Sequence, residues 1–269
     1  MTRDFTYGVY SKLLETGLDS DYTFLTVKKY LSQETTPKRS IILRHDIDRK
    51  PENALDMARI EADAGISSTY YFRAIPKTFK PDIFQEIEEL GHEVGYHYED
   101  LDQTKGDVEA AREQFASNLE RFQDYVTVDT ISMHGNPLTW QDNREIWAEH
   151  DFGQYGLIGE VYLSFDFTEV TYFTDTNRTW YDEKTMVNDW PVGESKKPMQ
   201  INTTWDLMEI IENQQIDRFY ILTHPNRWAD TYSEWAAEVT KDTVINAGKY
   251  VLWLARRLRK PGKSKEKHV

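Results

Sequence analysis

Two aspartates end a short apolar run between Ile41 and Asp48, and they are the first residues in the chain whose types and spacing could do chemistry. Three consecutive aliphatic residues open this run, as in a strand covered on both faces. Asp46 and Asp48 are two positions apart, so an extended backbone points both carboxylates to the same side. Burying these two carboxylates costs free energy unless a metal, a cation or hydrogen bonds compensate. The spacing suits one metal ligand beside one general base; the alternative is that both acids are solvated or cap the next helix.

Histidines and further charged residues follow other apolar segments of the chain. Of the 7 histidines, His45, His97, His134 and His224 fall at predicted strand ends. His45 alternates to the face of its strand opposite the two acids, so we expect it to pack or to orient a neighbour rather than to bind metal. The other residues at strand ends are Arg44, Arg73, Glu99, Asp100, Glu160, Asp166, Asp175, Arg178, Arg227 and Trp228.

Alternating strands and helices are needed to bring these positions together. Apolar runs predict strands that begin at residue 41 and span residues 69–72, 92–98, 126–133, 156–163, 170–174 and 219–223. Amphipathic patterns predict helices over residues 5–14, 23–31, 51–64, 81–90, 107–125, 143–150, 205–213 and 235–258. This order is typical of an α/β protein with a parallel sheet, and we expect a closed or nearly closed parallel β/α barrel. In such a barrel the active site lies at the C-terminal ends of the strands.

Composition limits the class of protein and of site. With 269 residues of which 39% are hydrophobic, residues 1–269 can form a single domain with a sizeable core. The chain has 0 cysteines, so a metal site would need histidine and carboxylate ligands. A net charge of -14 argues against nucleic acid as a partner. No signal peptide or membrane span is visible, so we expect a soluble cytoplasmic protein; no feature of the sequence predicts its oligomeric state.

The order and spacing of three motifs resemble those of the polysaccharide deacetylases of carbohydrate esterase family four. The motifs are the aspartates of the first strand, the run Gly91-His92-Glu93-Val94-Gly95-Tyr96-His97, and Leu222-Thr223-His224-Pro225, and the resemblance covers residues 41–228. It implies a distorted β/α barrel and metal-dependent removal of acetyl from an N-acetylated sugar or glycan. By motif position Asp46 would be the catalytic base, Asp48 and His97 metal ligands, and His224 the general acid.

The chain departs from the family pattern at three points. Ile47 separates the two aspartates, so the roles of base and ligand could be exchanged between them. Leu101 stands where the family has a second metal-binding histidine. The third ligand is then His134 or Asp100, and we favour His134 because imidazole suits zinc, the expected divalent metal. The Arg-x-Pro-Tyr segment of the family is absent, so its oxyanion donor cannot be assigned.

Five residues near the strand ends are predicted to bind the carbohydrate substrate: Arg73, Arg178, Trp180, Arg227 and Trp228. Arg73 could pair with Asp46 and keep it ionised, or with another acid of the barrel. The two tryptophans could stack on sugar rings. Two other functions stay open: a related hydrolase acting on another amide or C-N bond, and a glycan-binding protein without catalysis.

The C-terminal tail, residues 256–269, is basic although the chain as a whole is acidic. One interpretation is a final helix followed by a solvated end. The other is peripheral contact with an anionic membrane, at about 1 kcal/mol for each basic residue near the surface.

Overall fold

Parallel strands form the centre of the molecule in the computed structural model, which describes residues 3–136, 139, 141–180 and 201–243. Seven strands run in the order β6-β5-β4-β3-β2-β8-β7, and β1 pairs with β2 next to β3. Within the described residues no pairing joins β6 to β7, so the sheet is a curled half-barrel. The strands are β1 (Thr23–Leu25), β2 (Ser40–Ile47), β3 (Thr69–Phe72), β4 (Glu93–Tyr98), β5 (Thr130–Met133), β6 (Gly159–Glu160), β7 (Thr171–Thr174) and β8 (Arg218–Thr223). The predicted single-domain α/β fold, a distorted parallel β/α barrel, is confirmed.

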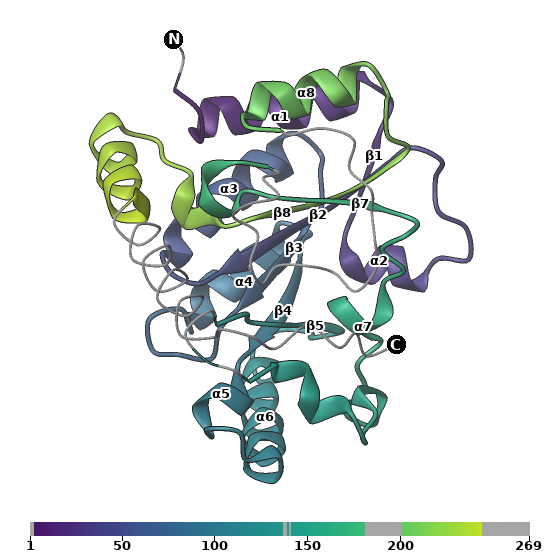
Figure 1. Cartoon of the computed structure of the whole chain (residues 1–269), viewed down its shortest axis with the longest axis vertical. Coiled ribbons are helices and arrows are strands. Elements are labelled where there is room, and N and C mark those ends of the chain that lie inside the picture. The colour runs from purple at the N-terminus through teal and green to yellow at the C-terminus, as the bar shows by residue number, and fades with distance from the viewer. Residues whose placement is uncertain (1–2, 137–138, 140, 181–200, 244–269) are drawn as a thin grey trace, which may run out of the picture.

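Helices connect the strands and cover the sheet, and in Figure 1 α1 and α8 lie side by side at one end of the molecule, far from α6. The α-helices are α1 (Tyr7–Asp19), α2 (Val27–Ser32), α3 (Pro51–Asp63), α4 (Pro81–Glu89), α5 (Asp100–Gln103), α6 (Val108–Gln123), α7 (Val161–Ser164) and α8 (Thr204–Glu212). Short 3-10 helices are η1 (Asn143–Trp147), η2 (Phe152–Tyr155), η3 (Thr176–Arg178) and η4 (Pro225–Arg227), and residues 232–243 are helical. None of the helices that the structure describes is long and apolar enough to cross a membrane.

Strand β2 lies in the interior of the sheet and is buried at all of its positions. Its side chains alternate between two environments, as the period of an extended strand requires. Ile41 and Leu43 pack in the core formed with α1, α3 and α8. Ile42 packs on the other face, among the aromatic side chains of the barrel interior. Arg44 and Asp46 share that interior face, so β2 delivers charged groups to the inside of the half-barrel.

Three predicted elements differ from the structure. Residues 23–31, predicted as one helix, form β1 followed by α2, because Thr26 caps α2 by accepting a hydrogen bond from Lys29 N at 3.0 Å and β1 pairs with β2. The predicted strand 156–163 is reduced to β6, because Glu160 caps α7. The predicted helix 143–150 is the 3-10 helix η1. Of the predicted helix 235–258, residues after 243 lie outside the described residues, as does the tail 256–269.

Candidate active site

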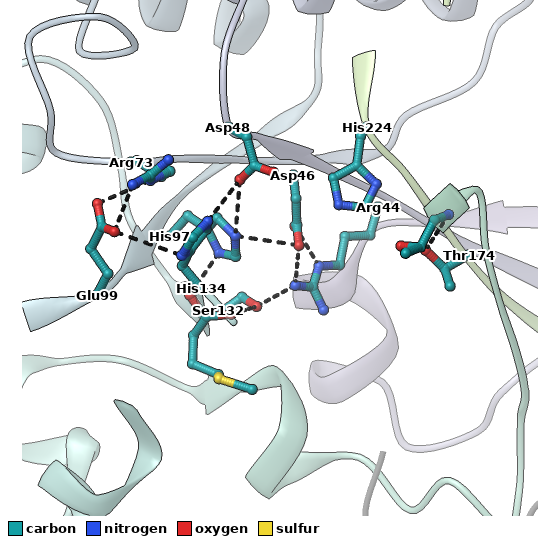
Figure 2. Close-up of polar contacts among 12 residues, drawn as sticks. Arg44, Asp46, Asp48, Arg73, His97, Glu99, Ser132, His134, Thr174 and His224 are labelled. Carbon is teal, nitrogen blue, oxygen red and sulfur yellow. Dashed lines mark hydrogen bonds and ion pairs between the residues drawn. The ribbon is translucent and has the colours of Figure 1, made fainter. Parts of the chain in front are cut away.

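Three of the predicted metal ligands meet at the C-terminal edge of the sheet. Asp48 follows β2, His97 lies in β4, and His134 follows β5. One ligand atom of each residue lies within 4.8 Å of the others, and His134 Nε2 is 3.2 Å from Asp48 Oδ1 (Figure 2). The order of the strands accounts for this convergence, because parallel neighbours place their C-terminal ends on one edge.

The hydrogen bonds of this trio fit a bound cation. His97 Nδ1 lies 3.0 Å from the carbonyl oxygen of Ser132, so Nδ1 carries the proton and Nε2 keeps its lone pair. That lone pair faces Asp46 Oδ2 at 3.5 Å and Asp48 Oδ1 at 3.9 Å. Burial lowers the pKa of His97 to about 3, so the ring stays neutral near pH 7. A lone pair facing two carboxylates is repulsive unless a cation lies between them.

Asp48 provides the charge that such a cation needs. Burial raises the pKa of Asp48, but the combined effect of His134, His224 and His97 lowers it, and the net pKa is well below its ordinary value. Its Oδ1 atom is buried and accepts no hydrogen bond from the described residues. Two imidazoles and one carboxylate form the donor set of a three-ligand catalytic zinc site, and they also suit other divalent first-row metals. The residues present therefore fit a divalent metal ion.

Asp100, the alternative third ligand, faces away from the trio. Its Oδ2 accepts from Tyr96 Oη at 2.8 Å, and its Oδ1 accepts from Asn118 Nδ2 at 2.9 Å and Gln114 Nε2 at 3.2 Å. Burial raises the pKa of Asp100 to about 6. Since its acceptor oxygens are engaged by β4 and α6, the geometry favours His134 over Asp100, and the choice of His134 as the third ligand stays a prediction.

Arg44, and not Arg73, holds the carboxylate of Asp46. Arg44 Nε donates to Oδ1 at 2.7 Å and Arg44 Nη2 to Oδ2 at 2.6 Å, in a fully buried two-point pair (Figure 2). Burial raises the pKa of Asp46, but the combined effect of Arg44, His97 and His224 lowers it, so the net pKa is lowered and Asp46 is ionised near pH 7. Arg73 instead pairs with Glu99, which was the other alternative for its partner. Arg44 could have been found from its position two residues before Asp46, on the same side of the strand.

His224 is oriented by Asp175, a residue to which the sequence assigned no role. Asp175 follows β7, and β7 pairs with β8, which ends one residue before His224. Asp175 Oδ1 accepts from His224 Nδ1 at 2.7 Å and its Oδ2 accepts from His224 N at 2.9 Å. Nε2 is then the ring nitrogen left for chemistry, and in Figure 2 His224 lies beside Asp46. Asp175 could have been identified from the sequence, because it is an acid at the end of a predicted strand.

The two predicted sugar-stacking tryptophans belong to the core. Trp180 and Trp228 are 0% exposed and pack with Phe5. Their Nε1 atoms donate to Thr204 Oγ1 at 3.1 Å and Asp175 Oδ2 at 3.0 Å. Neither ring offers a face to a sugar, so the predicted stacking is wrong.

The predicted substrate arginines are paired with buried acids. Arg227 Nη1 donates to Asp175 Oδ1 at 2.9 Å, and Arg178 Nε donates to Asp242 Oδ2 at 3.0 Å. Arg73 Nε and Nη2 donate to Glu99 at 3.0 and 2.6 Å. Contact of these arginines with a substrate stays a prediction.

Comparison with known proteins gives similarity at the level of fold. No protein-family model and no curated protein matches the sequence. Among solved structures, the chain is similar to the Xyl-CE4 domain of a multidomain xylanase from the hindgut metagenome of Trinervitermes trinervoides, with 14% identity and a TM-score of 0.37 over 82% of this chain and 85% of that one. It is also similar to a family 4 carbohydrate esterase from Bacillus anthracis, with 11% identity and a TM-score of 0.37 over 89% and 86% of the two chains.

Proposed function

We propose that this chain is a metal-dependent hydrolase that removes acetyl from an N-acetylated sugar or glycan. The observation that carries the proposal is the arrangement at one edge of the sheet: a carboxylate and two imidazoles close enough to share a metal, with an ionised carboxylate and an oriented imidazole beside them. Asp48, His97 and His134 are the ligands, Asp46 is the base and His224 is the acid. Zinc is the metal we favour, because the donor set is the one found in three-ligand catalytic zinc sites.

Each part of the arrangement has a task in amide hydrolysis. Asp48, His97 and His134 would hold a divalent metal, which would polarise the acetamide carbonyl and lower the pKa of a water molecule. Asp46, kept ionised by Arg44, accepts the proton of that water. His224 Nε2 gives a proton to the departing nitrogen, while Asp175 holds Nδ1 and stabilises the ring when it is charged. Since water is the nucleophile, no serine or cysteine is required.

The substrate class rests on the family motifs around His97 and His224. The geometry supports hydrolysis of an acyl or amide group but does not distinguish an acetamide on a sugar from another amide or C-N bond. Against a purely glycan-binding protein stands the retention of a buried base and a dyad of Asp175 and His224 next to the trio. A binding surface has no need of those ionisable groups.

Metal analysis and acetate release test the proposal together. Protein stripped of metal and reconstituted with zinc, manganese or cobalt is expected to hold about one ion per chain. It is then offered free N-acetylhexosamines, their oligomers and their nucleotide conjugates, and released acetate is measured. The double variant Asp48→Ala, His97→Ala should bind little metal and release no acetate. Asp100→Asn, which alters a buried acid outside the trio, should retain both properties.

The possible outcomes separate the competing functions. Negligible metal in the reconstituted wild type, or unchanged occupancy in the double variant, removes the metal site. Release of amine or ammonia from amides other than acetamides, with no acetate released from the N-acetylated sugars, indicates the related hydrolase. Saturable binding of an N-acetylated sugar without turnover in metal-loaded protein indicates the glycan-binding alternative.

A further inference from the structure

Glu99 lies next to His134 on the side of the ring away from Asp48. It follows β4 and occupies the N-cap position of α5, yet its side chain makes no capping hydrogen bond. The carboxylate instead turns toward the ends of β3 and β5, where it meets Arg73 and His134 (Figure 2). Its Oε2 atom is 3.6 Å from His134 Nδ1, and the residue is buried with 5% exposed. Glu99 therefore contacts residues of the site and does not cap helix α5.

Arg73 fixes the carboxylate of Glu99 in this orientation. Arg73 follows β3, the neighbour of β4 in the sheet, and donates to both oxygens at 3.0 and 2.6 Å. A two-point pair of this kind sets the plane of the carboxylate as well as its distance. Glu99 Oε2 is thereby held where it can accept a second hydrogen bond, from the ring of His134.

The backbone of His134 is already fixed, so the orientation of its ring is what Glu99 can influence. His134 N donates to Tyr98 O at 2.8 Å, and His134 O accepts from Asn143 Nδ2 at 3.0 Å. Nδ1 is buried and has no hydrogen-bond partner at the described distance. A movement of roughly 0.5 Å by the ring brings Nδ1 within hydrogen-bond range of Glu99. With the proton on Nδ1, the lone pair of Nε2 points at Asp48, as the lone pair of His97 Nε2 does.

We infer that the Arg73 and Glu99 pair is the positioning device of the third metal ligand: it selects the tautomer of His134 in which Nε2 is free to bind the metal. The inference rests on the proposed function, because it assigns the metal to Asp48, His97 and His134. Each of the two histidines then has a partner on the Nδ1 side that leaves Nε2 free for the metal, but the partners differ. His97 Nδ1 is held by a backbone carbonyl, and His134 Nδ1 faces a carboxylate 3.6 Å away. Partners of this kind orient metal-binding histidines and raise their basicity.

Zinc affinity of Glu99→Gln tests the inference. The amide group keeps the shape of the side chain, but its nitrogen can donate to His134 Nδ1, which favours the tautomer whose Nε2 carries the proton. We expect zinc affinity, measured by competition with a chelator on the full chain, to fall about 10- to 100-fold. Asp100→Asn is the matched control: it alters the next residue, also buried, which contacts Tyr96 and Asn118 and not His134. Its zinc affinity should stay within roughly twofold of wild type.

Two further measurements keep the test decisive if Glu99→Gln folds poorly. Arg73→Lys replaces the two-point hold by a single flexible donor and should give an intermediate loss of zinc affinity. The imidazole nitrogen NMR spectrum of zinc-loaded wild type should show the proton of His134 on Nδ1, with Nε2 on the metal. Wild type that binds no zinc would overturn the proposed metal site as a whole. Wild type that binds zinc, with unchanged affinity in Glu99→Gln and Arg73→Lys or with the proton on Nε2, would overturn this inference alone.

Discussion

Replacement of Asp175 by asparagine tests the pair that orients the proposed acid. The carboxylate is fully buried and accepts four hydrogen bonds, from His224 N, His224 Nδ1, Arg227 Nη1 and Trp228 Nε1, at 2.9, 2.7, 2.9 and 3.0 Å. Asparagine has one acceptor oxygen, which can serve the two donors on one side of the group. The two donors on the other side then face an NH2 group and lose their acceptor.

The pKa of Asp175 gives the size of the effect. Burial raises this pKa, but His224 and Arg227 outweigh burial and lower it from 3.8 to about 2. A shift of roughly two units corresponds to about 2.5 kcal/mol of folding free energy. Since the pKa is depressed in the folded protein, this stability is present above the unfolded pKa and is lost as the pH falls through the folded value. We expect Asp175→Asn to lower the free energy of unfolding by about 3 kcal/mol at pH 7, with a smaller difference from wild type toward pH 3.

The catalytic activity of Asp175→Asn should also fall, for a reason separate from its lower stability. Without the carboxylate, His224 is no longer held with Nε2 toward the site, and kcat for acetate release should decrease by about 10²- to 10⁴-fold while metal occupancy is retained. Asp242→Asn is the control, because Asp242 is also buried and pairs with arginines but does not contact His224. It should lower stability in urea unfolding and leave kcat near that of wild type. Wild-type kcat in Asp175→Asn, or equal losses of kcat in both variants, would refute the assigned role.

Three further predictions follow from other residues. Asp46→Asn should fold and keep its metal yet lose acetate release by about 10²-fold or more, because Arg44 remains but the base does not; wild-type turnover would remove Asp46 from the mechanism. Burial raises the pKa of Glu160 to about 7 from 4.5. Its contribution to stability is therefore complete below pH 4.5 and is lost as the pH rises through about 7, a change of about 3 kcal/mol that urea unfolding should show in wild type and not in Glu160→Gln. If the basic tail docks on anionic membranes, full-length protein should cosediment with anionic vesicles at low salt and not at high salt, whereas a chain ending at Leu258 should not bind; equal behaviour of the two chains would exclude that role.

Local pattern determined the order of the elements and the convergence of the proposed metal ligands. The apolar run before Asp48 is buried as β2, and the glycines that stop the helices before β3 and β4 have positive φ, +72° at Gly65 and +92° at Gly91. Parallel topology then places the ends of β2, β4 and β5 on one edge, so Asp48, His97 and His134 could be predicted from their positions along the chain. The predicted elements at residues 23–31 and 156–163 were less accurate. Thr26 and Glu160 each cap a helix there, and β1 pairs with β2, so a strand and a helix replace the single element predicted in each range.

Tertiary structure alone decided which charged groups pair. The order β3-β2-β8-β7 and the register between β7 and β8 bring Asp175 to His224, although 49 residues separate them. Several acids were within reach of Arg73, and only the geometry of β3 and β4 assigns it to Glu99 and leaves Arg44 to hold Asp46. The burial of Trp180 and Trp228 depends on α1 and α8 packing over the same end of the sheet. Ion pairs and burial are set by distances between segments remote in sequence, which residue type and spacing along the chain do not specify.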